Sequence, residues 1–411
     1  MVTQVWKRSA GWALGAGVLS AIAAASLVVA MGPALAATSN LSPKVDSTYQ
    51  TNGRVDTIVT IGNNVYIGGQ FTSVRPSGAA LGTGEVPRSH LAAFDRTTGA
   101  LLTWNPGADK EVLALTPSLD DTAVYVGGLF GKVGGVSRSR LAEVDASTGA
   151  VMAWAPKTDQ QVNTIAVTPT LIYFGGTFDQ VNGVARSRLA AVNGSGTLDP
   201  TWMPAADNRV RVIQPAPDGL SLFVGGDFLS INGATTQKIL VRLSLVDGSP
   251  LAWAFHPGYP IHSIAFLGST LYAAGDGSGG HIGAFDLSSG ARLWTLQTDG
   301  GVQAITIMNG VVYGGGHFDN VCVGVVDGST TGFKCPTNQA TRHKILAIDP
   351  VTGAIDPWDP GANSPLGVFA LANAGGSLQT GGDFTKMGSP DIAGQATWAQ
   401  QGYGQFSPTV G

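Results

Sequence analysis

Four aspartates at one repeated position are the residues of this chain best suited to bind a cation. Each stands three residues before a valine that opens an apolar segment, and Asn52 has the same place before Val55. The four aspartates are Asp109, Asp159, Asp207 and Asp299. Oxygen ligands gathered at one place suit Ca²⁺ or another hard cation. We therefore expect either a ring of metal ligands or, as the alternative, a turn capped by each aspartate.

The N-terminal segment has the pattern of a secretory signal peptide. Lys7 and Arg8 precede an apolar stretch over residues 13–31, and a cleavage site lies between Ala36 and Ala37. An uncleaved membrane anchor is the alternative, because the stretch approaches about 18 apolar residues. We expect a secreted protein, extracellular or associated with the cell envelope, that is not inserted in the membrane once the signal is removed.

Two cysteines, Cys322 and Cys335, remain after cleavage. A closely spaced pair in an exported protein predicts a disulfide. A metal site that includes the flanking His317 and His343 is the alternative, although two thiols without further cysteines seldom form one.

Other kinds of chemistry have little support. The mature chain has no His-Glu-x-x-His pair and no Gly-x-Ser-x-Gly elbow, so catalysis is disfavoured. A net charge of −4 argues against nucleic acid as a partner. Only 12% of the residues are charged and 44% are hydrophobic, which excludes a disordered chain.

One element recurs along the chain and must position these residues. It is an apolar strand that ends in Gly-Gly, then any residue, then Phe. Six copies begin at Gly68, Gly127, Gly175, Gly225, Gly315 and Gly381, and a worn copy begins at Ala274. The Gly-Gly pairs are expected to permit bulges or a close approach of neighbouring strands.

Further motifs follow each copy and complete a unit of about 50 residues. Arg-Ser-x-Leu begins at Arg88, Asp-x-x-Thr-Gly begins at Asp95, and Trp-x-Pro begins at Trp104, with similar series downstream. We expect the arginines to bridge neighbouring units or, as the alternative, to line a ligand groove. The tryptophans are expected to fill the space between units. Short β-rich runs separated by turn residues predict four strands per unit.

The fold class predicted is therefore all-β, a single β-propeller with seven four-stranded blades. Residues 1–36 are the signal peptide, 37–400 the propeller and 401–411 a C-terminal tail. The last unit has its third strand near residues 395–399 and lacks a fourth. Residues 45–49 resemble the fourth strand at 198–202, so the N-terminal strand is expected to complete the last blade and remove a free sheet edge.

On these motifs the chain resembles the delta-60 type β-propeller repeat of exported bacterial proteins. The resemblance covers almost the whole mature chain, and the pair Cys322 and Cys335 after Gly-His-Phe is similar to members of that group. It implies a propeller fold and an exported location. It implies no agreed activity.

Two insertions break the repeat, and they mark either the place where a partner binds or, as the alternative, surface insertions that the fold tolerates. Phe71 and Arg88 are 17 positions apart, and Phe318 and Arg342 are 24 apart, where other units have 8. Both loops are expected on one face of the propeller, and long loops on a rigid scaffold often carry function. We expect a monomeric, non-catalytic binding scaffold for an extracellular protein or glycan.

Two other functions remain open. One is an enzyme with a site at the channel mouth, either metal-assisted, with Ca²⁺ as the candidate ion, or similar to quinone-dependent dehydrogenases. The other is a structural component of the cell envelope.

Overall fold

The computed structural model describes residues 38–236, 238–254, 257–322, 335, 339–388 and 396–409. The predicted signal peptide and its cleavage site at Ala36 and Ala37 lie outside the described residues. None of the described residues forms a helix with the length and hydropathy that crossing a membrane requires.

The described residues form strands and turns, which confirms the all-β class. Eleven antiparallel sheets are present in this part of the chain, and seven of them each contain an inner, a second and a third strand in chain order. Their inner strands are β2 (Val55–Ile61), β7 (Val112–Pro117), β12 (Val162–Val167), β17 (Val210–Pro215), β21 (Ile261–Leu267), β25 (Val302–Met308) and β30 (Val368–Ala374). The second strands are β3 (Asn64–Gly69), β8 (Ala123–Gly128), β13 (Ile172–Gly176), β18 (Ser221–Gly226), β22 (Thr270–Gly277), β26 (Val311–Gly316) and β31 (Ser377–Gly382). The third strands are β6 (Leu91–Asp95), β11 (Leu141–Asp145), β16 (Leu189–Val192), β19 (Leu240–Ser244), β23 (Gly279–Asp286), β29 (Ile345–Ile348) and β34 (Tyr403–Phe406).

The outer parts of the sheets are less regular. Fourth strands are β20 (Pro250–Leu251) and β24 (Arg292–Thr298), and four other sheets have a single bridge in this place. Short strands form hairpins between the second and third strands. They are β4 (Ser73–Arg75) with β5 (Val86–Pro87), β9 (Lys132–Val133) with β10 (Val136–Ser137), β14 (Gln180–Val181) with β15 (Val184–Ala185), β27 (Asn320–Cys322) with β28 (Gln339–Thr341), and β32 (Lys386–Met387) with β33 (Trp398–Ala399). β1 (Gln50–Thr51) pairs with β4.

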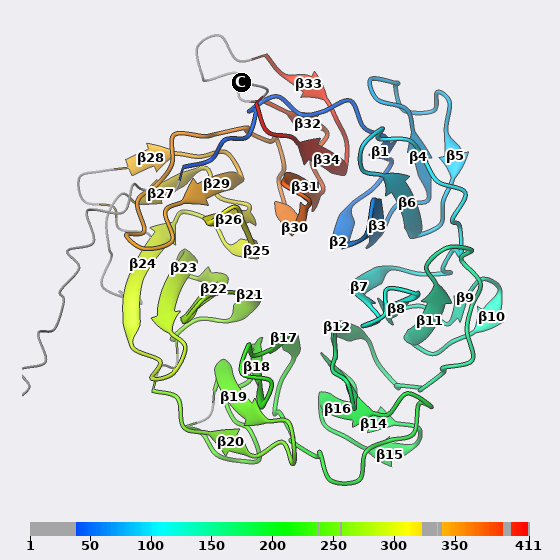
Figure 1. Cartoon of the computed structure of the whole chain (residues 1–411), viewed down its shortest axis with the longest axis vertical. Coiled ribbons are helices and arrows are strands. Elements are labelled where there is room, and N and C mark those ends of the chain that lie inside the picture. The colour runs from blue at the N-terminus through cyan, green and yellow to red at the C-terminus, as the bar shows by residue number, and fades with distance from the viewer. Residues whose placement is uncertain are drawn as a thin grey trace, which may run out of the picture. The chain divides into compact units, whose positions relative to one another are not determined.

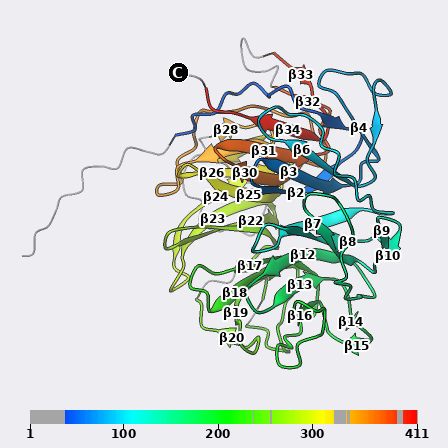
Figure 2. The same cartoon turned by 45° about the vertical axis from the view of Figure 1, so that its right-hand side comes forward.

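The sheets follow one another around a ring in chain order (Figures 1 and 2). Neighbouring inner strands contact each other, and β30 contacts β2, so the last sheet meets the first. The first glycine of each pair permits this packing. A Cβ added at Gly381 would lie 2.6 Å from Cγ1 of Val55, and one added at Gly315 would lie 2.7 Å from Cγ1 of Val368. The expected close approach at these glycines is thus confirmed.

The N-terminal segment occupies the outer position of the last sheet. Leu41 forms a bridge with Pro408, and the amides of Ser42 and Asp46 donate to the carbonyls of Ser407 and Gln405 at 2.9 and 2.8 Å. Its chain lies beside β34 in both views (Figures 1 and 2). The expected pairing of the two ends is therefore present.

The expected limits of the last sheet were wrong. Its third strand is β34, which pairs with β31, whereas Trp398–Ala399 is β33 in a hairpin with β32. Tyr403 and Phe406 are fully buried, while Trp398 is only partly buried. Burial thus places residues 403–406, expected in a tail, within the propeller.

The repeated arginines and tryptophans have different structural roles. Trp104 Nε1 donates to the carbonyl of Asp145 in the next blade at 3.0 Å, so the tryptophan joins blades as expected. Arg138 instead donates to the carbonyls of Ser137 and Met152 within its own blade. The expected bridging by arginine was wrong, because its guanidinium satisfies carbonyls at the outer edge of the same sheet.

Candidate functional site

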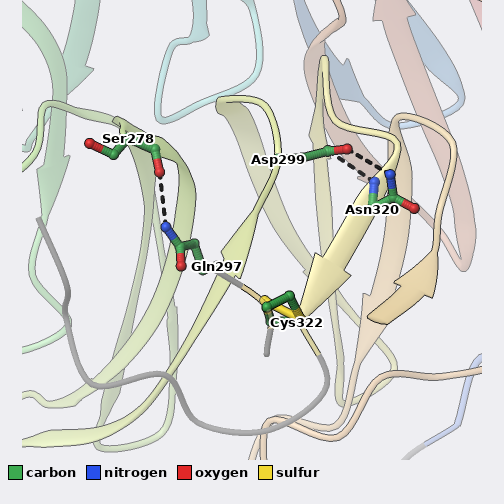
Figure 3. The surroundings of a disulfide bond; sticks show 6 residues. Ser278, Gln297, Asp299, Asn320 and Cys322 are labelled. Carbon is green, nitrogen blue, oxygen red and sulfur yellow. Dashed lines mark hydrogen bonds between the residues drawn. A yellow bond between two sulfur atoms is a disulfide. The ribbon is translucent and has the colours of Figure 1, made fainter. Parts of the chain in front are cut away.

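The predicted ring of oxygen ligands is a set of turn caps. The Asp109 carboxylate accepts hydrogen bonds from the amides of Gly131 and Lys132 at 2.8 and 2.9 Å. Equivalent pairs of consecutive amides bond to Asp159, Asp207, Asp299 and the Asn52 side-chain oxygen. Figure 3 shows Asp299 beside Asn320, whose side-chain amide also donates to it at 2.7 Å.

Each cap holds the segment that follows Gly-Gly-x-Phe in its own blade. Burial raises the pKa of Asp109, but the bonds from Lys132 and Gly131 outweigh this and leave the pKa below its usual value. Within the described ranges no group of three or more His, Cys, Asp or Glu side chains is placed to hold a metal ion. The structure therefore does not bring the predicted ligands together.

Cys322 and Cys335 form a disulfide with a Cα–Cα distance of 5.4 Å at the end of β27 (Figure 3). This agrees with the prediction and leaves no thiol for the alternative metal site. The two flanking histidines have other partners. His317 Nε2 accepts from the Gly301 amide at 3.1 Å, and His343 Nδ1 lies 3.1 Å from the Asp359 carboxylate.

A β-bulge at the start of every inner strand creates a different candidate site. In β2, Val55 pairs with Gly69 and Thr57 with Gly68, so Asp56 is the extra, unpaired residue. The same shift of register occurs in the other six inner strands. Bulges re-aim side chains and often lie beside active sites. The bulged residues are Asp56, Leu113, Asn163, Arg211, His262, Gln303 and Phe369.

These seven residues all line one cavity of ≈ 540 Å³, which we call the central cavity. Residues that precede the opening valine also line it, including Arg54, Glu111, Gln161 and Arg209. Because every inner strand contributes, the cavity lies on the axis of the ring. Its side chains are positioned by the most regular part of the fold.

Arg54 joins the first two blades across the wall of the central cavity. Its Nε lies 2.5 Å from Asp56 Oδ1, and its Nη2 lies 2.5 Å from Glu111 Oε1. The same guanidinium lies over the ring of Phe369 at 4.6 Å from its centroid, which is within reach of a cation–π interaction. One arginine thus holds residues from three blades.

A second charged network belongs to the fourth and fifth blades. Arg209 Nε and Arg211 Nε donate to the two oxygens of Asp227 at 2.8 and 2.6 Å. His262 Nε2 lies 2.9 Å from Asp276 Oδ2. Burial raises the pKa of Asp227, but Arg211 and then Arg209 outweigh it, so the pKa falls below its usual value.

Asp56 differs from the other carboxyl groups of the site. Its side chain is only 6% exposed. Its pKa is raised to about 7, chiefly by burial; the Arg54 guanidinium lowers the pKa and the Glu111 carboxylate raises it. A group with this pKa exchanges its proton near neutral pH, which is the property of many functional acids and bases.

The predicted site residues stand three positions before each opening valine. The residues that line the central cavity stand immediately beside that valine, and the prediction did not include them. A signal was present in the sequence. The valine and the glycines hardly change between repeats, whereas the residue after the valine is different in every copy. When one position varies within an otherwise constant repeat, the packing of the repeat does not determine the residue type at that position.

The comparisons with known proteins concern the fold. No protein-family model and no curated protein matches the chain. The structure is similar to the WD40 β-propeller domain of Doa1, with a TM-score of 0.55 and 9% identity over 88% of this chain and 97% of that domain. The computationally designed Ika8 protein has a TM-score of 0.49 and 16% identity over 88% and 98%. The strand order, the closed ring of inner strands and the likeness to the WD40 domain together show that this chain is a β-propeller.

Proposed function

We propose that the protein is an exported, non-catalytic propeller of the delta-60 type that binds an extracellular protein or glycan. One observation carries the proposal. Seven equivalent bulges hold seven different side chains in the central cavity, among them Asp56, Arg211 and Phe369. A purely structural ring has no need of seven different residues there, whereas recognition of a ligand does.

Two further features support the proposal, one for the position of the binding site and one for export. The 72–88 hairpin belongs to the connection between second and third strands, and in the fourth blade the same connection carries Asp227, which pairs with Arg209 and Arg211 of the cavity wall. The disulfide at Cys322 and Cys335 fits an oxidising compartment.

A binding selection tests the recognition part of the proposal. The full chain and an Arg209→Ala/Arg211→Ala variant are each screened against a peptide-display library and a glycan array. We expect binders whose affinity falls at least about tenfold in the variant, since charge-assisted hydrogen bonds are lost. Binders that retain equal affinity for the variant would place recognition elsewhere on the molecule.

Export has its own test. Protein recovered from the medium or envelope of an expressing bacterial culture is sequenced from its N-terminus. The proposal requires a chain that begins at Ala37. A cytoplasmic protein that retains residues 1–36 would contradict it.

A hydrolase is the second candidate, and a specific observation favours it. Asp56, whose pKa is raised to about 7, shares Arg54 with Glu111 in the central cavity. A protonated acid beside a carboxylate is the arrangement required for general acid and base catalysis. Release of nitrophenol from chromogenic glycosides, abolished in Asp56→Asn, would support this function over simple binding. No release by the parent protein would leave the binding function.

A further inference from the structure

We infer that the ligand of the central cavity is an uncharged, polyhydroxylated molecule, namely a neutral saccharide. The inference rests on the proposed function, because it names the class of ligand for the same site. Three properties of the cavity wall lead to it: its charge balance, its hydrogen-bonding groups and its apolar surface.

The charges of the wall cancel. Three arginines line the cavity, Arg54, Arg209 and Arg211, and they face the acidic side chains of Asp56, Glu111 and Asp276 in the wall and of Asp227 behind it. Each arginine is already ion-paired, through Asp56 and Glu111 on one side and Asp227 on the other. A polyanion would meet the carboxylates and a polycation the arginines, so either would face like charges on entering.

The wall offers both acceptors and donors of hydrogen bonds. The carboxyl groups of Asp56, Glu111 and Asp276 and the side-chain amide of Gln303 line the cavity. Their oxygens are hydrogen-bond acceptors. Arg209 and Arg211 are each bonded to Asp227 through Nε. The guanidinium group carries five N–H donors, so donors remain for a ligand.

A hydroxyl group suits such a mixed wall, because it both donates and accepts. An ammonium group only donates hydrogen bonds, so it cannot accept one from the arginines. A carboxylate only accepts hydrogen bonds, so it cannot donate one to Asp56 or Gln303. A molecule with many hydroxyls satisfies both kinds of group at once, wherever it contacts the wall.

The apolar part of the wall suits the carbon face of a sugar ring. Phe369, Leu113 and Leu129 line the same cavity as the polar groups. The volume of ≈ 540 Å³ lies within the ~300–1,000 Å³ of small-ligand sites. An apolar patch among a few placed polar groups is the usual composition of such sites.

Calorimetric titration of the full chain tests the inference. The probes are maltotriose, cellotriose and N,N′-diacetylchitobiose as neutral saccharides, trigalacturonate as a polyanion, and spermidine as a polycation. We expect a neutral saccharide to bind and both charged probes to fail. Gln303→Leu removes one polar side chain of the cavity wall at similar volume, and we expect it to weaken binding about tenfold or more.

Gln160→Leu is the matched control, because Gln160 is exposed and lies outside the central cavity. It should bind as the parent does, and equal melting temperatures would show that both variants are folded. If a charged probe binds and the neutral saccharides do not, the saccharide inference is wrong while the cavity remains the binding site. If no probe binds, the inference is also wrong, and the binding function then depends on the library selection alone.

Discussion

Gly226 in β18 lies directly against the carbonyl oxygen of Arg209, the residue that precedes β17. A Cβ at Gly226 would overlap that oxygen and would also lie 3.0 Å from Cα of Val210. The second glycine of every pair makes the equivalent contact, including Gly275 of the worn copy. The motif that defines the repeat therefore also places the backbone of the central cavity.

Replacement of this glycine should disturb both the fold and the site. Gly226→Ala forces the Arg209 backbone outward in a closely packed region, and we expect a loss of about 1–3 kcal/mol in the free energy of unfolding. Urea denaturation measures it. Gly194→Ala is the control, because an added Cβ there has nothing within 4 Å. Equal losses in the two variants would contradict the role of the carbonyl contact.

The strand order was predictable from sequence because it depends on local repeats. Val55, Gly68 and Gly69 recur in the other units. Each makes one packing contact in the structure, and its residue type indicates that contact. The closure of the ring was also predictable, since residues near Leu41 supply the outer position that the last sheet lacks. The limits of β34 were not predictable, because the hairpin of β32 and β33 separates β34 from the Gly-Gly-x-Phe motif of its sheet.

The site could be predicted only in part. Asp109 and its equivalents are conspicuous because they repeat, yet repetition marks a structural task, here the capping of Gly131 and Lys132. Asp56 and Arg211 do not repeat. Their importance depends on the bulge and on their neighbours across the ring, which no local pattern contains.

Asp56 should make stability depend on pH. Burial raises its pKa from 3.8 to about 7 in the folded chain. Between about pH 4 and pH 7 the folded chain holds a proton that the unfolded chain has released, so stability falls as pH rises through this window and is level above it. The upper limit of the effect is roughly 4 kcal/mol.

Asp56→Asn removes this dependence while it keeps the shape of the side chain. We expect the variant to gain stability over the parent as pH rises from about 5 to about 8, measured by urea unfolding at each pH. Asp120→Asn is the control, because Asp120 is exposed in a turn. Parallel curves for Asp56→Asn and the parent would show that the carboxyl group is ionised throughout.

His281 should act in the opposite direction. Its side chain stacks on Tyr259 with ring centroids 4.1 Å apart, and burial lowers its pKa from 6.5 to about 4. The unfolded chain therefore binds a proton first as pH falls, and stability is lost between about pH 6.5 and pH 4. His281→Phe keeps an aromatic ring and removes the titration, so its stability should decline less on acidification. A variant as acid-sensitive as the parent would refute this.

The cysteines should be unreactive in the native protein. Cys322 and Cys335 are joined, and the described residues contain no free cysteine. Thiol titration of the denatured, unreduced protein should therefore find none, and titration after reduction should find two.

The bond closes a segment with a sequence separation of 13, for which restriction of the unfolded chain predicts about 3 kcal/mol of stabilisation. Because the bond lies beyond the inner strands, Cys322→Ser/Cys335→Ser should lower the urea midpoint without altering saccharide binding in the central cavity. Loss of binding in that variant would tie recognition to the disulfide loop instead.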